Sequence, residues 1–160
     1  VISCIDDNSM KSFRFWVKPH PTMPVNRIKN EFGNKWPKFF EFIFFDTQTA
    51  LRKVDILISG MSSICLEAMA FGIPVLVITQ SQGLQYNPIP NVLDQDLWKQ
   101  CDSSQNILDG IEHYRKRDEE ELARHHQLGL QIRKTYFEPV IREGVLKILG
   151  IKGDSIVAES

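Results

Sequence analysis

The stretch Val54–Ile78, VDILISGMSSICLEAMAFGIPVLVI, contains a complete strand–helix–strand pattern, and the rest of the chain can be arranged around it. Four apolar residues within Val54–Ile58 favour a parallel strand that is covered on both faces. Gly60 ends this strand, and the almost entirely apolar segment Ile64–Phe71 is typical of a buried helix that Gly72 terminates. A second apolar run follows directly, so the stretch predicts a βαβ unit.

The start of this helix has the chemistry of an anion site. Its first backbone N–H groups lack partners inside the helix and lie at the positive end of the helix dipole. Gly60, Ser62 and Ser63 precede them, and a glycine with two hydroxyls at this place suits a phosphate group. A plain serine N-cap is the alternative interpretation.

Glu67 is not explained by helix capping. A capping box places the acid three residues after the cap, whereas Glu67 lies four residues after Ser63 and one turn deeper on the same face. A carboxylate on an apolar helix needs a basic neighbour or a ligand that donates hydrogen bonds. The diol of a ribose is such a ligand.

The segment Ser59–Val75, SGMSSICLEAMAFGIPV, resembles the nucleotide-binding signature in the C-terminal half of GT-B glycosyltransferases. The resemblance implies that Ser62 and Ser63 hold the donor phosphates and that Glu67 holds the ribose hydroxyls. Many retaining GT-B enzymes carry a second glutamate eight positions before this one, and Ser59 stands there instead. An inverting mechanism is therefore expected.

A second motif follows the aromatic segment Phe13–Lys18, which is predicted to be a strand. The sequence continues Lys18-Pro19-His20-Pro21, a rigid turn that places His20 just beyond the carboxyl end of the strand. Open α/β sheets bind their ligands at this edge. An imidazole fixed between two prolines can face a phosphate or a leaving group, and an ordinary surface histidine is the alternative.

This KPHP segment resembles the HP motif of bacterial sialyltransferases and of CDP-glycerol glycerophosphotransferases, which pair it with a later double serine. Ser62-Ser63 corresponds to that double serine. The resemblance implies a catalytic His20 and a phosphate site formed by Lys18, His20, Gly60 and the two serines. The turn Phe44-Phe45-Asp46 similarly resembles the loop that contacts the base, with Phe45 as the base-binding residue. An aromatic core strand followed by a helix cap explains this turn equally well.

Composition limits the remaining possibilities. The chain has 160 residues, 42% hydrophobic side chains and a net charge of −1, as expected for one globular domain without a nucleic-acid surface. Three widely spaced cysteines indicate neither a disulfide framework nor a zinc site and suit the cytoplasm. No apolar segment is long enough to span a bilayer, so any membrane association would be peripheral. No metal site is predicted, and His113, His125 and His126 are expected to be solvated.

Other elements complete a Rossmann-like α/β domain over 1–160, with a parallel sheet and helices on both faces. Val1–Ile5 is interpreted as the end of a first helix, so the domain would lack its first strand, which is central in such a sheet. The tail 151–160 is expected to be frayed. Further predicted elements are helices in Pro24–Phe32, Gln48–Lys53, Ser104–Arg117, Asp118–Phe137 and Glu138–Leu149, and strands in Phe39–Phe45 and Leu97–Cys101.

The expected function is that of the donor-binding half of a metal-independent glycosyltransferase, or a glycerophosphotransferase, in bacterial surface polysaccharide synthesis. Its donor would be a nucleotide-sugar or a CDP-polyol, no further cofactor is required, and a missing N-terminal Rossmann-like domain would supply the acceptor site. The fragment alone would be inactive. Two alternatives remain open, namely an enzyme like UDP-N-acetylglucosamine 2-epimerase and a nucleotide-binding module without catalysis.

Overall fold

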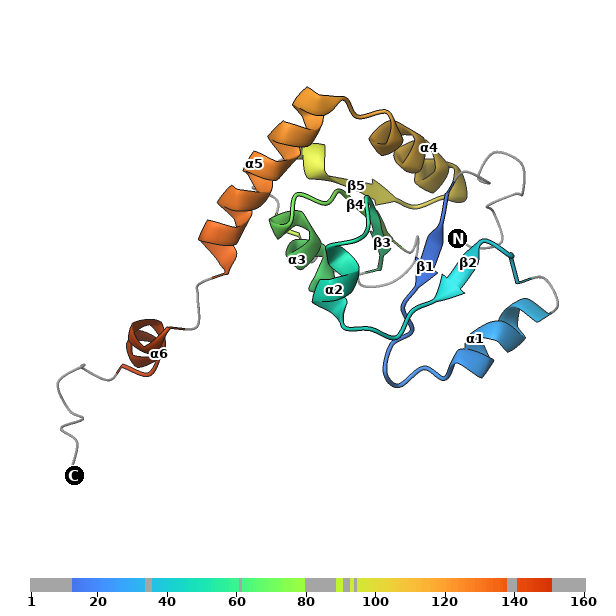
Figure 1. The fold of residues 1–160 in the computed structure, drawn as a ribbon, viewed down its shortest axis with the longest axis horizontal. Coiled ribbons are helices and arrows are strands. Elements are labelled where there is room, and N and C mark those ends of the chain that lie inside the picture. Colours follow the sequence, from blue (N-terminus) through green and yellow to red (C-terminus); the bar gives the residue numbers. More distant parts are fainter. Residues whose placement is uncertain are drawn as a thin grey trace.

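The structure is a computed structural model that describes residues 13–33, 36–60, 62–79, 89–90, 93, 95–137 and 141–150. Strands and helices alternate along most of this part (Figure 1), which confirms the predicted α/β class. The predicted helix end Val1–Ile5 and the tail 151–160 lie outside the described residues. In chain order the elements are β1 Phe15–Val17, α1 Val25–Phe32, β2 Phe40–Phe42, α2 Thr47–Leu51, β3 Leu57–Ser59, α3 Ile64–Ala70, β4 Val75–Ile78, a 3-10 turn Gln95–Leu97, β5 Trp98–Cys101, α4 Ser104–Arg115, α5 Glu119–Tyr136 and α6 Arg142–Ile148.

The described strands form two small parallel sheets, where the sequence predicts one sheet. β1 pairs with β2 in the first sheet, and β4 lies between β3 and β5 in the second. The edge position predicted for the last strand is confirmed, because β5 pairs only with β4 among the described strands. The register places Phe15 opposite Phe40, Leu57 opposite Val75, and Val75 opposite Trp98.

The β3–α3–β4 segment has the predicted βαβ form. Gly72 ends the helix with a φ of 74°, a conformation that favours glycine. A Cβ at Gly72 would also lie 2.9 Å from the carbonyl oxygen of His125, so the helix end leaves no room for a side chain. Val75, Leu76 and Val77 of β4 are then fully buried, as expected for an inner parallel strand.

Helices cover both faces of the three-stranded sheet (Figure 1). On one face, Val75 lies in an apolar cluster with Met69 of α3 and Ile132 of α5, which we call the α3/α5 cluster. On the other face, Leu76 lies in a second cluster with Ile111 of α4, which we call the α4 cluster. Because successive side chains of a strand point to opposite faces, β4 forms the centre of both clusters.

The long helix α5 lies against α3 at two glycines. A Cβ added to Gly129 would lie 2.5 Å from the backbone nitrogen of Gly72 and 2.9 Å from the carbonyl oxygen of Met69. The contact therefore depends on the absence of a side chain at Gly129.

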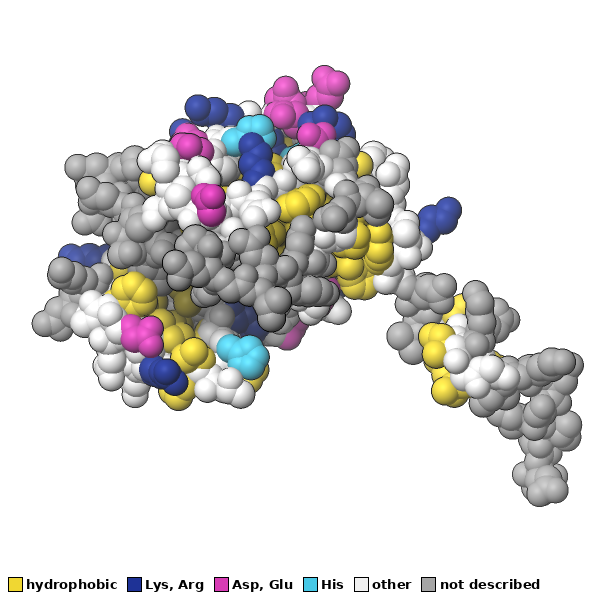
Figure 2. All heavy atoms as spheres, turned by 180° about the vertical axis from the view of Figure 1, so that it is seen from behind, with side chains coloured by type: hydrophobic (Ala, Val, Ile, Leu, Met, Phe, Trp, Pro, Cys, Tyr) yellow, Lys and Arg dark blue, Asp and Glu magenta, His cyan; other side chains and the backbone are white. Residues whose placement is uncertain are grey.

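Beyond α5, helix α6 stands away from the body of the molecule (Figure 1), and Figure 2 shows apolar side chains exposed there. The exposed apolar residues in this region are Ile141, Val145, Ile148 and Leu149. None of the described helices is long and apolar enough to cross a membrane.

The two sheets share one apolar cluster. Phe40 of β2 belongs to the α4 cluster, and Phe15 and Val17 of β1 pack against it. Ile56 and Ile58, before and within β3, pack against the same cluster. Side chains therefore join the two sheets, although no strand of one pairs with a strand of the other.

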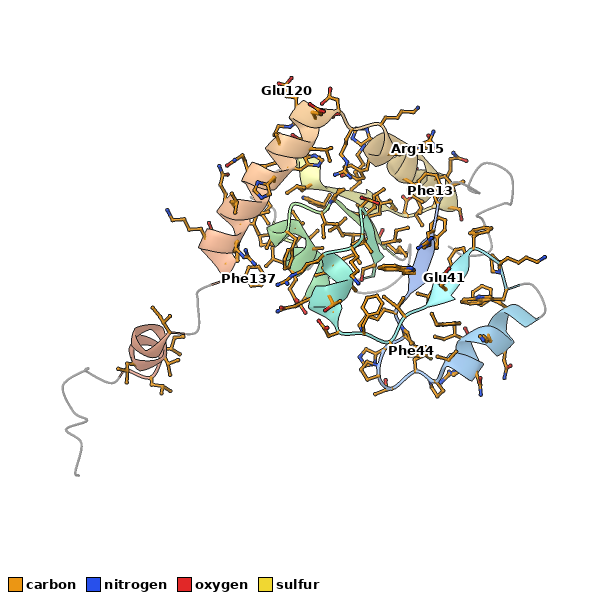
Figure 3. All side chains as sticks on the ribbon, viewed as in Figure 1. Phe13, Glu41, Phe44, Arg115, Glu120 and Phe137 are labelled. Carbon is orange, nitrogen blue, oxygen red and sulfur yellow. The ribbon has the colours of Figure 1, made fainter. Side chains whose placement is uncertain are left out.

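The amino ends of β1 and β3 lie at one corner of the molecule. The guanidinium of Arg115 lies 5.6 Å from the ring centre of Phe13, just before β1 (Figure 3). Two residues later, Arg117 donates a hydrogen bond from Nη2 to the carbonyl oxygen of Asp55, just before β3, at 3.1 Å. The two strands thus begin next to the same short segment, which contains Arg115 and Arg117.

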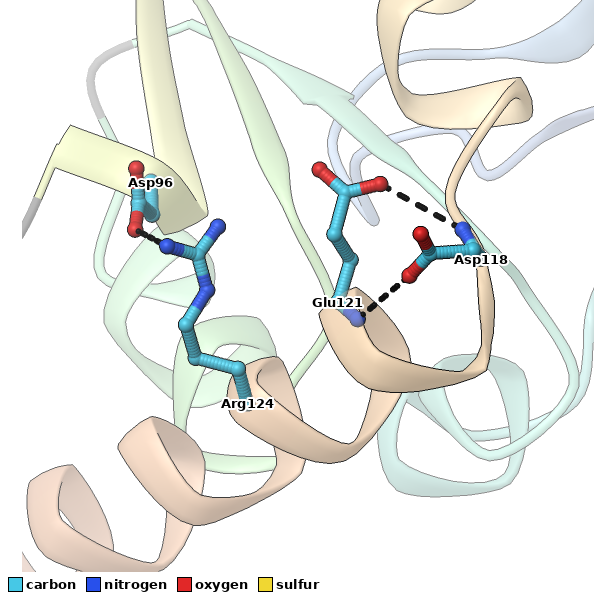
Figure 4. A network of polar contacts seen from close by, with 4 residues as sticks. All are labelled: Asp96, Asp118, Glu121 and Arg124. Atoms are coloured by element: carbon cyan, nitrogen blue, oxygen red, sulfur yellow. Dashed lines mark hydrogen bonds and ion pairs between the residues drawn. The ribbon is translucent and has the colours of Figure 1, made fainter.

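Helix α5 begins with a full capping box (Figure 4). The carboxylate of Asp118 accepts from the backbone N–H of Glu121 at 2.8 Å, and the carboxylate of Glu121 accepts from the N–H of Asp118 at 3.3 Å. One turn later, Arg124 pairs with Asp96 at 2.7 Å. These contacts fix the start of α5 relative to the loop before β5.

Candidate functional site

Lys18 and Phe45 follow the carboxyl ends of the paired strands β1 and β2, and the structure brings them together. Lys18 Nζ donates a hydrogen bond to the carbonyl oxygen of Phe45 at 2.6 Å, across 27 positions of sequence. The ring of Phe45 meets the ring of Trp16 edge to face, with centroids 5.4 Å apart. The ammonium of Lys53 lies 5.5 Å from the centre of the same ring. Two residues predicted for separate parts of the site are therefore neighbours.

The Phe44–Asp46 turn contains the helix cap of the alternative interpretation but not an aromatic core residue at Phe44. The carboxylate of Asp46 accepts from the backbone N–H of Thr49 at 2.8 Å and caps α2. Hydrogen bonds from the hydroxyl and the amide of Thr49 hold the pKa of Asp46 below its usual value. Phe44, however, is 74% exposed and projects at the edge of the molecule (Figure 3), so it is not a core residue.

His20 is exposed and its ring is held by the turn that follows β1. The backbone N–H of Thr22 donates to His20 Nδ1 at 3.3 Å, and the hydroxyl of Thr22 lies 2.7 Å from the same nitrogen. The N–H of Met23 donates to the carbonyl oxygen of His20 at 2.8 Å and closes the turn. A neutral imidazole whose Nδ1 accepts from an amide carries its proton on Nε2. This Nε2–H is available to donate to a ligand.

The second group of predicted residues follows β3. Gly60, Ser62 and Ser63 are exposed, and the carbonyl oxygens of the two serines accept the first backbone hydrogen bonds of α3. Ser63 occupies the N-cap position with φ −57° and ψ −24°, and its side chain makes no capping bond. Helical dihedral angles at this position turn the hydroxyl away from the amides that an N-cap serves. Neither serine hydroxyl bonds another described residue. The plain N-cap interpretation is therefore wrong for the Ser63 side chain.

Glu67 lies in the first turn of α3 and is partly buried. No hydrogen bond or ion pair joins its carboxylate to another described residue. The basic neighbour that would explain this carboxylate structurally is thus missing from the described part of the chain. The site retains a carboxylate that can accept from a ligand.

Lys18 and His20 follow the carboxyl end of β1, and the Gly60–Glu67 segment follows the carboxyl edge of the sheet that contains β3. No hydrogen bond or ion pair between described residues joins Lys18, His20 or Phe45 to the Gly60–Glu67 segment. A shallow hollow of about 180 Å³ opens further along this edge, at the carboxyl ends of β4 and β5, and Ile78, Asp102 and Ser103 are among its lining residues.

A larger hollow, about 550 Å³, lies at the start of α5, beside Asp118 and Arg124. It is at the other end of the sheet and contains none of the predicted site residues. Within the described ranges, no group of three or more His, Cys, Asp or Glu side chains is arranged to hold a metal ion.

His125 is buried, which corrects the expectation that all three helical histidines are solvated. It is 3% exposed, whereas His113 and His126 are exposed. Arg117 Nη1 donates to His125 Nδ1 at 3.2 Å, and the ring of Tyr114 lies 6.1 Å away. Burial, together with the nearby arginines, lowers the pKa of His125. The sequence does not show which of two adjacent helical histidines is buried, because the burial of His125 depends on its contact with Arg117, which lies in the preceding loop.

Comparisons of the chain with protein families, with curated proteins and with solved structures find no match.

Proposed function

We propose that this chain is the nucleotide-donor-binding half of a GT-B-type glycosyltransferase that acts in bacterial surface polysaccharide synthesis. In this proposal the two small sheets are parts of one Rossmann-like sheet that lacks its central strand. The reaction is an inverting, metal-independent displacement at a nucleotide-activated sugar, or transfer from a CDP-polyol. The observation that carries the proposal is that each motif group, Lys18–His20 and Gly60–Glu67, directly follows the carboxyl end of a parallel-paired strand, β1 or β3.

Free polar groups at this edge support a phosphate and ribose site. Open α/β sheets bind ligands at the carboxyl ends of their strands. The hydroxyls of Ser62 and Ser63 have no hydrogen-bond partner among the described residues, and the carboxylate of Glu67 also has none. A half-buried carboxylate such as that of Glu67 is ordinarily paired, so one without a described partner, next to two exposed serine hydroxyls, suits a polar ligand.

Each residue has a role that follows from its chemistry. Ser62, Ser63 and the first amides of α3 donate hydrogen bonds to the diphosphate, while Glu67 accepts from both ribose hydroxyls. His20 donates its Nε2 proton to the phosphate oxygen that leaves. Lys18 adds a positive charge beside it.

In the sugar-transfer reaction, an acceptor oxygen forms a bond to the anomeric carbon. The bond from that carbon to the phosphate oxygen breaks, and its electron pair leaves with the nucleotide. The general base that takes the acceptor proton belongs to the other domain. Stabilisation of the charge that develops on the leaving phosphate is the contribution of this chain.

Titration with nucleotides tests the proposal. We expect calorimetry to detect weak binding of CMP, CDP or UDP, and NMR to show shifts of the Ser62 and Ser63 amides. His20→Asn should weaken the binding, whereas His113→Asn, on the exposed face of α4, should not change it. Absence of heat and of NMR shifts for CMP, CDP, UDP and GDP at millimolar concentration would reject the site.

A further inference from the structure

Thr22 contacts the ring of His20 through two different groups. Its backbone N–H donates to His20 Nδ1 at 3.3 Å, and its hydroxyl oxygen lies 2.7 Å from the same nitrogen. A backbone N–H can only donate, so Nδ1 accepts and carries no hydrogen of its own. The hydroxyl of Thr22 therefore donates as well, and it makes the shorter of the two contacts.

The β-turn after β1 determines the position of Thr22. The N–H of Met23 donates to the carbonyl oxygen of His20 at 2.8 Å, so Pro21 and Thr22 are the two central residues of the turn. Proline suits the first central position because its ring fixes φ at about −65°. Asp and Asn side chains at the start of a turn often accept from the backbone N–H two residues later. The imidazole of His20 takes this part here.

The backbone before the turn is held by β2. The N–H of Ile43 donates to the carbonyl oxygen of Val17 at 3.0 Å, and Lys18 Nζ donates to the carbonyl oxygen of Phe45 at 2.6 Å. His20 thus follows a backbone that is bonded on one side to β2 and is closed on the other by the turn. Its side chain has Thr22 as its hydrogen-bond partner within this frame.

The other ring nitrogen of His20 has no partner among the described residues. His20 is exposed, and its hydrogen bonds to the described chain all end at Nδ1. His126 is a useful contrast, because it is exposed and neither of its ring nitrogens bonds another described residue. Both neutral tautomers are open to His126, whereas the contacts of Thr22 select one at His20.

We propose that Thr22 is a positioning residue of the candidate site, whose hydroxyl and backbone N–H together hold His20 in the Nε2–H tautomer. The inference rests on the proposed function for the identity of the ligand group, a phosphate oxygen of the nucleotide donor, and not for the tautomer. A phosphate oxygen accepts hydrogen bonds, so it requires a hydrogen on Nε2. A general base would require a lone pair at the same atom. Thr22 thus selects hydrogen-bond donation at His20 over proton abstraction.

The hydroxyl is the part of this arrangement that depends on the residue type. Every residue except proline supplies a backbone N–H at position 22, but few side chains supply a donor beside Nδ1. Valine has the branched shape of threonine without the hydroxyl, and serine has the hydroxyl without the methyl group. Thr22→Val and Thr22→Ser therefore separate hydrogen bonding from packing in the turn.

Nitrogen NMR of the imidazole rings tests the role of Thr22 without a ligand. The chain has 4 histidines, and the signals that disappear in His20→Asn belong to His20. At about pH 8.5, where imidazole side chains are neutral, the shifts of Nδ1 and Nε2 report the ratio of the two tautomers. We expect His20 to be almost entirely in the Nε2–H form, and His126 to populate both forms.

Thr22→Val should lower the ratio of Nε2–H to Nδ1–H at His20 about fivefold, the effect of one neutral hydrogen bond. Thr22→Ser should keep the ratio of the wild type. Thr135→Val is the matched control, because the hydroxyl of Thr135 donates to the carbonyl oxygen of Gln131 and does not contact His20. An unchanged ratio in Thr22→Val, or a wild-type His20 that is mainly in the Nδ1–H form, overturns the inference.

Nucleotide titration connects Thr22 to the proposed function. Thr22→Val should weaken the binding of CDP or UDP several-fold, and Thr22→Ser should not. Combined with His20→Asn, Thr22→Val should add no further loss, because Thr22 acts through His20. An equal loss with and without His20 would mean that Thr22 contacts the ligand itself, which overturns the positioning role.

The two measurements fail in different ways. If no nucleotide binds, the proposed function is rejected, and the tautomer ratio still decides whether Thr22 positions His20. If nucleotide binds and the tautomer ratio does not respond to Thr22→Val, the proposed function stands and the inference about Thr22 is wrong.

Discussion

The guanidinium of Arg117 donates a hydrogen bond to the imidazole of His125, with Nη1 and Nδ1 3.2 Å apart. The acceptor nitrogen must be unprotonated, so the fold selects the neutral histidine. Arg124 also disfavours a charge on His125, while Asp96 and Glu121 favour it less strongly, and the pKa in the folded protein lies below 6.5. The unfolded chain therefore binds more protons at mildly acidic pH, and the stability contributed by neutral His125 is lost as pH falls below about 6.5.

We expect the free energy of unfolding of the wild type, measured in urea, to fall between pH 7 and pH 5 in part through His125. His125→Gln should flatten this fall, since an amide has no proton to gain. His126→Gln, at the exposed neighbouring position, should leave the slope as in the wild type. If the two variants show the same pH dependence, the buried contact with Arg117 does not control protonation.

Two serines at helix N-caps should differ in their effect on stability. The hydroxyl of Ser103 accepts from the backbone N–H of Asn106 at 3.2 Å, whereas the hydroxyl of Ser63 makes no capping bond. Ser103→Ala should therefore cost about 1 kcal/mol of unfolding free energy, and Ser63→Ala only a few tenths. Thermal and urea unfolding measure both. A large cost at Ser63 would mean that its hydroxyl supports the fold and is not free for a ligand.

Glu67→Gln should separate ligand binding from stability. With no described partner for its carboxylate, the substitution should change the melting temperature little. Nucleotide binding should weaken several-fold, because an amide has one accepting oxygen where the carboxylate has two, and it carries no charge to strengthen the bonds. Calorimetric titration with UDP or CDP measures the binding. Lost stability with unchanged affinity would identify a structural carboxylate instead.

Gly129→Ala should destabilise the protein although alanine is the better helix former. The new Cβ would lie 2.5 Å from the backbone nitrogen of Gly72, which cannot move without separating α5 from α3. Overpacking of this kind costs about 1–3 kcal/mol, against a propensity gain of about 1 kcal/mol. Gly60→Ala is the control, since its Cβ meets nothing within 4 Å. Equal unfolding midpoints for the two variants would contradict the close contact.

The parts of the fold that depend on local sequence could be predicted. The apolar runs of β3 and β4, with Gly72 at the helix end between them, specify the βαβ unit through periodicity and backbone conformation. The cap of α5 at Asp118 is likewise visible in its acidic first turn. Each of these signals lies within a few residues of the structure that it determines.

Features that depend on contacts distant in sequence could not be predicted. Ser63 and Ser103 are both serines before a helix, and only their backbone dihedral angles, helical at Ser63 and extended at Ser103, show which side chain caps. The hydrogen bond from Lys18 to the carbonyl of Phe45 requires β1 and β2 to be paired first. The location of the candidate site follows from the motifs, while the separation of its two halves follows from the division of the sheet.

The division of the sheet also has a consequence for the order in which the chain assembles. Residues 15–42 contain the paired strands β1 and β2, and residues 57–101 contain the sheet β3–β4–β5. Neither part therefore needs the other to form its backbone hydrogen bonds between strands. Helix α4 comes later in the chain, and its residue Ile111 belongs to the cluster that contains side chains of both. We therefore expect two cooperative units that pack together late in folding, with the α4 cluster as the interface between them. The same interface should be the first part to separate in denaturant.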